Sequence, residues 1–316
     1  LVGAACFPPL AANGTVYIGV KPSNYYCTVS AFDVDSGRQQ GTLSTSQTLS
    51  LSAPAVADET VYLGDRDAVH ALNSTLGQVL WVTKLGSYTR TSPVVTDDSV
   101  YVGCDDGVYA LQANHADRLF TTQAAVTSLC VADGTVYLGD EDWTVYAVDA
   151  SSGTQQWSRE ISGAPRSVVV ENGSIYTGTF AGLGPGTPGL HAIDADTGRL
   201  RWHKEHPTTS ASVVDDTVVT CGDGVCGFDV ESGATRWQFT DIQETQPPIS
   251  VSDGTAYFGE VLTGQLYGLN VSSGAVSWTS EIDEPTITSV SVGDGIGFVG
   301  TADHSLYAVE LDGHKL

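Results

Sequence analysis

Short apolar stretches alternate with polar turns along the whole chain, and the same order of stretches returns eight times. Each repeat has a turn rich in Asp, Asn and Gly, an apolar stretch that ends in Gly, and a second stretch that ends in a small and an aliphatic residue. Such short stretches between turn residues are typical of β-strands. The glycines that close the first stretch are Gly19, Gly64, Gly103, Gly139, Gly178, Gly222, Gly259 and Gly300. Their spacing of 36 to 45 residues predicts one β-unit per repeat.

The remainder of each repeat predicts a further turn and a fourth strand. After the small and aliphatic residues comes an acidic or amide residue, with Gly four positions later in most repeats and an aromatic residue four positions after that. The aromatic residues are Trp81, Phe120, Trp157, Trp202, Trp237 and Trp278. One four-stranded sheet cannot bury both of its faces alone. We therefore expect eight sheets to stack radially, with these aromatic residues between neighbours.

The spacing Ala-x-Asp-x-x-(Ser/Thr)-Gly-x-x-x-Trp stands in full at Ala147–Trp157 and Ala192–Trp202, with close variants at Gly227–Trp237 and Gly268–Trp278. It resembles the tryptophan-docking motif of the pyrroloquinoline-quinone-type, BamB-like β-propeller repeats, and the resemblance covers nearly the whole chain. It implies an all-β fold, an eight-bladed β-propeller of four-stranded antiparallel blades in one domain, residues 1–316. The last repeat ends at residues 312–316, before a fourth strand, so residues 1–7 are expected to complete the last blade.

Acidic residues outnumber basic ones, 37 to 13, and the formal net charge is −24. Such a surface repels phosphate groups, so nucleic acid is not an expected partner. Scarce Lys and abundant Asp are typical of a halophilic archaeon, where salt screens the repulsion. A calcium-rich or acidic extracellular setting is the alternative. No stretch is apolar enough to predict a membrane span. Because the sequence has no Met and no visible signal peptide, we expect a mature or trimmed product.

Cysteines and glycosylation sequons both indicate an extracellular or cell-surface location. The even number of cysteines makes all of them disulfide candidates: Cys6, Cys27, Cys104, Cys130, Cys221 and Cys226. Cys221 and Cys226 flank a tight turn and are expected within bridging distance; zinc is the alternative, without a Cys-x-x-Cys spacing to support it. The sequons make candidate glycosylation sites of Asn13, Asn73, Asn172 and Asn270. The alternative is that Asn simply suits turns.

The connections after the second and fourth strands are expected to meet on one face of the propeller, where binding residues concentrate. The candidates are Tyr25, Tyr26, Phe180, Arg90, Arg166, His203 and His206. The aromatic residues suit a protein or sugar surface, the arginines an anion, and the two histidines a metal ion. Packing and pairing within the loops is the alternative for each of them. His70 and His191 stand where other repeats place Tyr, so we interpret them as packing residues.

Acidic clusters on the same face predict a possible calcium site, because hard cations prefer oxygen ligands. The candidate ligands are Asp65, Asp67, Asp105, Asp106, Asp140 and Asp142. In a chain this acidic, solvated loops are the alternative interpretation.

Three functions remain as hypotheses. The first is a non-catalytic cell-surface propeller that serves as a scaffold for protein or glycan partners, with no cofactor other than calcium. The second is a quinoprotein dehydrogenase with pyrroloquinoline quinone and calcium; the resemblance implies adjacent cysteines above the quinone, which this sequence lacks. The third is a structural subunit that forms homo-oligomers or polymers through the open edge of the last blade. No nucleophile elbow and no His-Glu-x-x-His motif is present.

Overall fold

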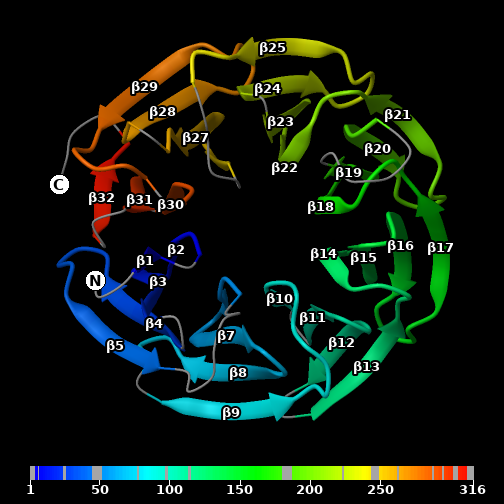
Figure 1. Cartoon of the computed structure of the whole chain (residues 1–316), viewed down its shortest axis with the longest axis horizontal. Helices are drawn as coiled ribbons and strands as arrows, with labels where there is room; N and C mark the ends of the chain where they lie inside the picture. Colours follow the sequence, from blue (N-terminus) through cyan, green and yellow to red (C-terminus); the bar gives the residue numbers. More distant parts are fainter. Residues whose placement is uncertain are drawn as a thin grey trace.

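In the computed structural model the chain forms a ring of eight antiparallel β-sheets, the blades of a propeller (Figure 1). The structure describes residues 4–5, 7–23, 26–44, 52–76, 78–96, 99–112, 115–179, 187–222, 224–242, 249–261, 263–286, 288–293, 295–301 and 305–311. These residues contain strands and turns but no helix, so none of them forms a helix that could cross a bilayer. The expected all-β, eight-bladed fold is confirmed.

The first four blades follow one another along the chain. Blade one has β1 (Ala4–Ala5), β2 (Leu10–Ala12), β3 (Thr15–Ser23), β4 (Tyr26–Asp33) and β5 (Gln39–Ser44). Blade two has β6 (Ala55–Ala57), β7 (Thr60–Asp65), β8 (Ala68–Asn73) and β9 (Val79–Lys84). Blade three has β10 (Val94–Val95), β11 (Val100–Cys104), β12 (Gly107–Gln112) and β13 (His115–Thr121). Blade four has β14 (Val126–Ala132), β15 (Thr135–Asp140), β16 (Thr144–Asp149) and β17 (Gln155–Glu160).

The last four blades complete the ring. Blade five has β18 (Pro165–Glu171), β19 (Ser174–Thr179), β20 (Leu190–Asp194) and β21 (Leu200–Lys204). Blade six has β22 (Thr208–Val214), β23 (Thr217–Gly222), β24 (Gly224–Asp229) and β25 (Thr235–Phe239). Blade seven has β26 (Ser250–Ser252), β27 (Thr255–Gly259), β28 (Gln265–Asn270) and β29 (Val276–Glu281). Blade eight has β30 (Ser291–Gly293), β31 (Ile296–Gly300) and β32 (Leu306–Glu310).

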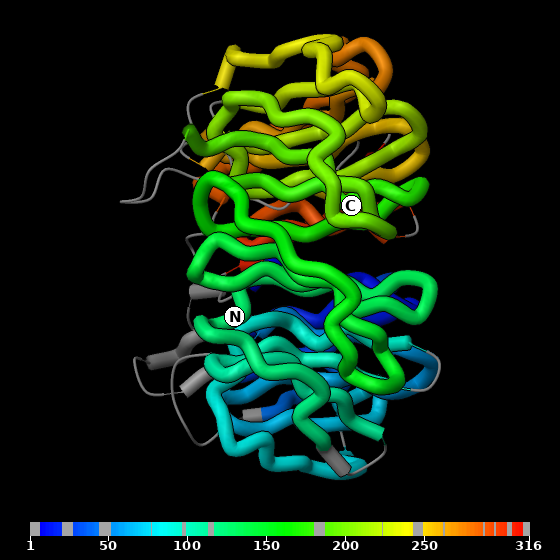
Figure 2. Tube along the Cα trace, turned by 90° about the vertical axis from the view of Figure 1, so that its right-hand side faces the viewer, coloured from blue at the N-terminus to red at the C-terminus, as the bar shows by residue number. Residues whose placement is uncertain are grey.

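Within each complete blade the first strand lies innermost and the fourth lies on the outer rim (Figure 1). Figure 2 shows the ring from the side, with the strand connections gathered at its two faces. Because neighbouring strands are antiparallel, the second-to-third turns and the blade-to-blade connections share one face, which we call the connection face. The first-to-second and third-to-fourth turns lie on the opposite face.

The described N-terminal strands β1 and β2 pair within blade one, whereas residues 1–3 and 6, which were also expected to complete the last blade, lie outside the described residues. Ala4 and Ala5 of β1 pair with Lys21 and Val20 of β3, and β2 pairs with β3 through a tight turn. Asn13 and Gly14 in that turn have φ values of 52° and 68°, the geometry that closes a two-residue hairpin. This local hairpin forms the inner edge of blade one, and Ala11 of β2 packs against blade eight at Gly293.

The hydrophobic core lies between the blades. At the junction of blades five and six, for example, Tyr176, Leu190 and Ala192 pack against Val218 and Phe228, all of them buried. Small residues permit this approach: a Cβ added to Gly139 would lie 2.4 Å from the Cβ of Pro165 in the next blade. In blade six the pattern is shifted by one residue. Cys221 takes the place that Gly178 has in blade five, since Cys221 pairs with Val225 as Gly178 pairs with Leu190.

The strand register also overturns the expected pairing of Cys221 with Cys226. Cys226 lies opposite Thr220, the neighbour of Cys221, and successive residues of a strand point to opposite faces of the sheet. Cys221 therefore packs towards blade seven and Cys226 towards blade five. Cys104 and Cys130 are free thiols. Cys6 lies outside the described residues, and Cys27 is described by its backbone alone.

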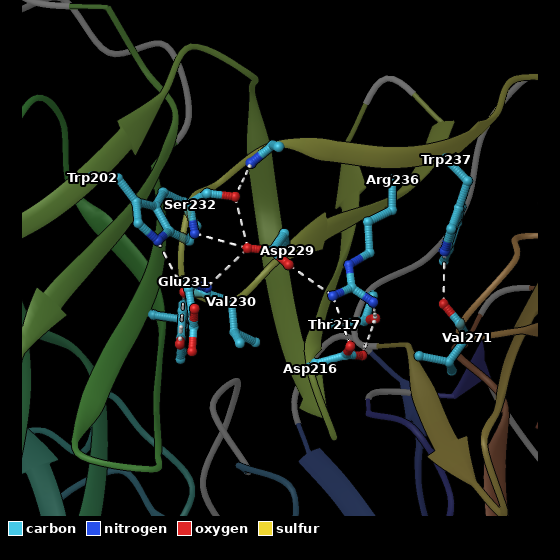
Figure 3. Close-up of polar contacts among 12 residues, drawn as sticks. Trp202, Asp216, Thr217, Asp229, Val230, Glu231, Ser232, Arg236, Trp237 and Val271 are labelled. Atoms are coloured by element: carbon cyan, nitrogen blue, oxygen red, sulfur yellow. Dashed lines mark hydrogen bonds and ion pairs between the residues drawn. The ribbon is translucent and has the colours of Figure 1, made fainter.

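Three tryptophans connect consecutive blades in the same way, and Figure 3 shows two of them, Trp202 and Trp237. The indole Nε1 of Trp157 donates to the carbonyl of Ala195 at 2.8 Å, Trp202 to Val230 at 2.9 Å, and Trp237 to Val271 at 2.6 Å. Each acceptor stands directly after the third strand of the next blade. The indole thus covers apolar surface and satisfies a turn carbonyl at once.

The other aromatic residues at this position also pack beside tyrosines. Trp81 contacts Tyr62 with ring centroids 6.0 Å apart, and Trp278 contacts Tyr257 at 5.9 Å. Phe120 replaces tryptophan in blade three and reaches Tyr146 of blade four at 5.6 Å.

Each acceptor turn is held by the acidic or amide residue that ends the third strand. In blade six, Asp229 accepts hydrogen bonds from the backbone and hydroxyl of Ser232 at 2.9 and 2.7 Å (Figure 3). Arg236 pairs with Asp229 and with Asp216, both at 2.7 Å. The Arg236 guanidinium and the Ser232 donors hold the pKa of Asp229 far below its usual range.

One polar pair lies in the interior of blade five. The rings of His191 and His203 stack with centroids 4.3 Å apart, and His191 is only 3% exposed. Ser162 shares a hydrogen bond of 3.1 Å with the Nε2 atom of His191. Burial and the neighbouring His203 ring lower the pKa of His191 to about 4, so this ring is neutral at pH 7.

Replacing the docking glycine of blade six tests the tryptophan contact. Gly233 has φ +67°, and a Cβ there would lie 2.7 Å from the Trp202 ring. Gly233→Ala is expected to lower the free energy of unfolding by about 1–2 kcal/mol through backbone strain and by a further 1–3 kcal/mol, roughly, through the clash. Gly173→Ala is the matched control, because Gly173 has φ +68° and open space around it. Equal losses of unfolding free energy for Gly233→Ala and Gly173→Ala in guanidinium titrations would contradict the docking contact.

A second prediction concerns pH. The unfolded chain protonates His191 near pH 6.5, whereas the folded chain resists protonation down to about pH 4. Stability should therefore fall as the pH drops through this window, by about 3 kcal/mol from this residue. His191→Phe should remove this part of the decrease, and His70→Phe, at the same position of blade two, should retain it. If the free energies of unfolding of wild type and His191→Phe fall in parallel from pH 7 to 4, the prediction is contradicted.

Candidate functional site

The connection face is built by turns and blade connections that bond to one another. Leu85, after β9, donates its backbone N–H to the carbonyl of Asp67 at 2.7 Å, and Asp105 donates to the carbonyl of Tyr88 at 3.0 Å. The connection between blades two and three is therefore fixed to the second-to-third turns of both blades. Side chains that project from this ordered backbone have defined positions.

Basic side chains gather on the connection face of blades two and three. Of the 13 Lys and Arg residues in the sequence, four lie here: Arg66, Lys84, Arg90 and Arg118. Together with Tyr88 we call them the basic patch. A hollow of about 580 Å³ lies in it, lined by Arg66, Lys84 and Tyr88 together with Asp67, Ser87 and Asp105.

Aspartates position three of the cations. Lys84 Nζ lies 2.8 Å from Asp67, Arg118 Nη1 lies 2.8 Å from Asp106, and Arg90 pairs closely with Asp105. These pairs are partly exposed, so each contributes little to stability. Their main consequence is geometric, because the paired side chains have fewer conformations to lose when a ligand binds.

Arg66 and Tyr88 form the centre of the patch. The Arg66 guanidinium carbon lies 5.4 Å from the centre of the Tyr88 ring, and its Nη2 donates to the Tyr88 hydroxyl at 3.3 Å. The cation and the ring therefore stabilise each other's position. Tyr88 remains 49% exposed and presents an apolar ring face with a polar tip to solvent.

The electrostatics of the patch favour fixed charges over proton transfer. The hydrogen bond from Lys84 lowers the pKa of Asp67. Burial opposes ionisation of Asp106, but hydrogen bonds from Ser87, Arg118 and Tyr109 outweigh it and lower that pKa. Cys104, beneath the patch, is buried, and burial with the nearby aspartates raises its thiol pKa to about 12. This thiol is not an activated nucleophile.

The structure places the calcium candidates in separate interactions. Asp67, Asp105 and Asp106 face the three cations of the patch, and Asp65 lies 3.5 Å from the His70 ring. Asp140 is fully buried, accepts from the Tyr146 hydroxyl and from the backbone of Thr144 and Asp142, and has its pKa raised by burial. Within the described ranges, no three His, Cys, Asp or Glu residues lie close enough to hold a metal ion.

The other predicted binding residues do not converge. Arg90 joins the patch, whereas Arg166 lies exposed on the inner strand β18. His203 stacks on His191, and His206 packs beside Phe228 with ring centroids 5.4 Å apart, so neither ring arrangement is a metal site. Tyr25 and Phe180 lie outside the described residues, and Tyr26 is described by its backbone alone.

The four sequons all lie on the opposite face. Asn13 and Asn172 occupy first-to-second turns, and Asn73 and Asn270 begin third-to-fourth turns. Asn13, Asn172 and Asn270 are exposed. The amide of Asn13 donates to the carbonyl of Asp58 at 2.7 Å, and the side-chain carbonyl of Asn270 accepts from Ser273, as Asp229 does from Ser232. Sugars at these positions would leave the connection face uncovered.

Sequence reasoning missed Arg66, Lys84, Tyr88 and Arg118. The available signal was the rarity of basic residues in this acidic chain. Arg66 and Lys84 lie in one repeat, and Arg118 lies in the next. Taken together, the patch is suited to bind a surface that offers carboxylates and apolar groups.

Comparison with known proteins agrees with the fold. A family model described as outer membrane protein assembly factor BamB matches residues 26–182, 141–294 and 228–316. The assembly factor BamB of Salmonella typhimurium is 28% identical over 290 residues, which cover 82% of this chain and 71% of that protein.

Two relatives of other kinds match over shorter segments. The quinohemoprotein alcohol dehydrogenase ADH-IIG of Pseudomonas putida is 29% identical over 141 residues, and the serine/threonine-protein kinase AfsK of Streptomyces coelicolor is 27% identical over 130 residues. These segments cover 35% and 39% of this chain, and they span only 19% of the dehydrogenase and 15% of the kinase.

The crystal structure of BamB from Moraxella catarrhalis shares the fold. It aligns with a TM-score of 0.76 at 17% identity and covers 96% of this chain and 95% of that chain. The three matched segments of the family model overlap and together span residues 26–316. The chain therefore belongs to the family of the outer membrane protein assembly factor BamB.

Proposed function

We propose that this chain is a non-catalytic scaffold of the cell envelope that binds a protein partner through the basic patch. Membership of the BamB family supports this role, because the named relatives of this family are assembly factors of the outer membrane. The observation that carries the proposal is the Arg66–Tyr88 pair, whose tyrosine ring is exposed, on an ordered connection face.

The chemistry of the patch suits protein recognition. Arg and Tyr are enriched among the residues that contribute most to protein interfaces. Tyr88 offers a large ring with few rotatable bonds, and Arg66 lies against it. The two side chains therefore lose little conformational entropy when a partner binds.

Charge indicates the kind of partner. Four cations and the aspartates Asp65, Asp67, Asp105 and Asp106 balance locally, whereas the chain as a whole carries −24. An acidic protein surface is repelled less here than on a surface of the chain's average charge. Carboxylates of such a partner can replace the aspartates of the patch around Arg66 and Lys84.

A quinone-dependent dehydrogenase is the second candidate, favoured by the match to the Pseudomonas putida alcohol dehydrogenase. That match covers 35% of this chain, and the six cysteines of the sequence stand at separate positions with no adjacent pair. The repeat shared with that enzyme is sufficient to account for the match, since one fold hosts many functions.

Site-specific crosslinking tests the scaffold role. A photoreactive phenylalanine at position 88, in cells that make the protein, is expected to yield discrete adducts with one or a few proteins. Arg66→Glu should reduce these adducts roughly tenfold or more, the loss expected for an interface residue of the strongest class. The matched control is the same photoreactive residue at Ser151, which is exposed in a turn of the opposite face. Discrete adducts from position 151 and none from position 88 would contradict the proposal.

Reconstitution tests the dehydrogenase. We expect purified protein mixed with pyrroloquinoline quinone and calcium to retain no visible absorption after gel filtration and to reduce no dye in the presence of an alcohol. Retained absorption that calcium chelation removes, together with dye reduction, would establish the enzyme and overturn the non-catalytic role.

A further inference from the structure

Exposed apolar side chains are concentrated in one segment of blade two. Among the described residues six large apolar side chains are exposed, and four of them lie between positions 79 and 88. Three belong to the outer strand β9, namely Val79, Leu80 and Val82, which are 45%, 48% and 47% exposed. The fourth is Tyr88 of the basic patch. We call Val79, Leu80 and Val82 the apolar strip.

The apolar strip is specific to blade two. The strand registers align the outer strands, because each docking tryptophan pairs with the small residue of its third strand. No other blade with such a tryptophan has more than one aliphatic residue at the three places of the strip, so docking itself does not require it. The residues there are Gln155, Gln156 and Ser158 in blade four, Leu200, Arg201 and His203 in blade five, Thr235, Arg236 and Gln238 in blade six, and Val276, Ser277 and Thr279 in blade seven.

Ion pairs occupy this part of the rim in blades five and six. Arg201 and Arg236, at the place of Leu80, lie 2.7 Å from Asp194 and Asp229. Blade two has Leu80 in place of the cation, and an asparagine ends its third strand in place of the carboxylate. Exposed apolar side chains that gather beside polar ones mark sites of protein interaction.

The apolar strip continues into the basic patch. Val82 and Lys84 are two residues apart on β9, so their side chains point to the same side of the sheet and lie about 7 Å apart along the strand. Trp81 points to the other side and packs on blade three. The Lys84 side chain is 72% exposed, and its Nζ lies 2.8 Å from Asp67. Apolar groups and a cation therefore follow one another along one rim strand that ends at the connection face (Figure 1).

We propose that the apolar strip and the basic patch form one surface, which binds a segment of a protein partner whose apolar side chains are followed by a carboxylate. This inference rests on the scaffold role and names the chemistry of its partner. In an extended segment alternate side chains are also about 7 Å apart, so aliphatic groups can cover Val79 and Val82 while Asp or Glu meets Lys84. Apolar burial supplies affinity, and the charge pair fixes the direction of the segment.

A second copy of the chain fits this surface less well. A stable interface buries roughly 800 Å² on each partner, and three half-exposed side chains offer much less. In a two-fold pairing of β9 around Trp81, Lys84 lies opposite Gln78 of the second copy, which offers no charge. Two copies also bring together two net charges of −24.

A lipid surface fits less well for a different reason. Anionic headgroups attract clusters of Lys and Arg whose charge is available to the membrane. Aspartates accompany Lys84, Arg90 and Arg118 in the basic patch, and the chain as a whole is strongly acidic. An anionic membrane is therefore repelled by most of the surface around the apolar strip.

Photocrosslinking at position 82 tests the proposed surface. A photoreactive phenylalanine there, in cells that make the protein, is expected to capture the same protein as position 88. Mass spectrometry of the adduct should place the crosslink beside an aliphatic residue that has Asp or Glu close to it in the sequence. The matched control is position 279, because Thr279 is exposed and stands after Trp278 as Val82 stands after Trp81. Position 279 should not capture that protein.

A double variant measures what the strip contributes. Val79→Ser with Val82→Ser should reduce the adducts from position 88 roughly tenfold or more, because two half-exposed side chains no longer bury apolar area. Val276→Ser with Thr279→Ser changes the same two places in blade seven, where Val276 is 47% exposed, and should leave these adducts unchanged. Similar unfolding curves of the two double variants show that both fold.

Several outcomes would overturn the proposal. A crosslink from position 82 to the chain itself would make a second copy the occupant, and a crosslink to lipid would make it a membrane. A captured segment without a carboxylate, or no adduct at position 82 beside discrete adducts at position 88, would also refute it. Adducts at position 88 that the strip variant leaves unchanged would remove this proposal and retain the scaffold role. Absence of adducts at position 88 would remove both.

Discussion

The docking of one blade's outer strand onto the turn of the next blade is the interaction on which the ring depends. A four-stranded sheet needs neighbouring sheets to bury its faces. The next blade packs closely only if the turn after its third strand can approach the aromatic residue of the first blade's outer strand. Gly233 lacks a Cβ at the point where the Trp202 ring rests, and the indole Nε1 satisfies the carbonyl of Val230. The Gly-x-x-x-Trp spacing in the sequence is thus required by the turn geometry that closes the junction between two blades.

Local pattern was sufficient to predict the strands, their order and the docking tryptophans, because each of these features depends on residues within one repeat. Long-range choices were not predictable in the same way. The N-terminal residues joined blade one because the Asn13–Gly14 hairpin is local, and Cys221 and Cys226 separated because one residue of register moves a side chain to the other face. The basic patch was missed because Arg66 and Tyr88, or Asp106 and Arg118, meet only through the connections between strands.

The same architecture separates apolar packing from polar binding chemistry. The junctions between blades bury apolar side chains around the docking tryptophans. The connection face of blades two and three presents a polar, charge-balanced patch on a strongly acidic chain, and its aspartates fix the cations that they accompany. Binding at this patch requires no change in the fold.

Hydrogen–deuterium exchange resolved by residue tests the central claim, that tryptophan docking closes the junctions between blades. The account predicts that Gly233→Ala makes the backbone amides of residues 230–233 exchange roughly tenfold or more faster than in wild type, whereas Gly173→Ala leaves them unchanged. Unchanged exchange of these amides in Gly233→Ala would contradict it, because it would mean that the junction is closed without the tryptophan contact.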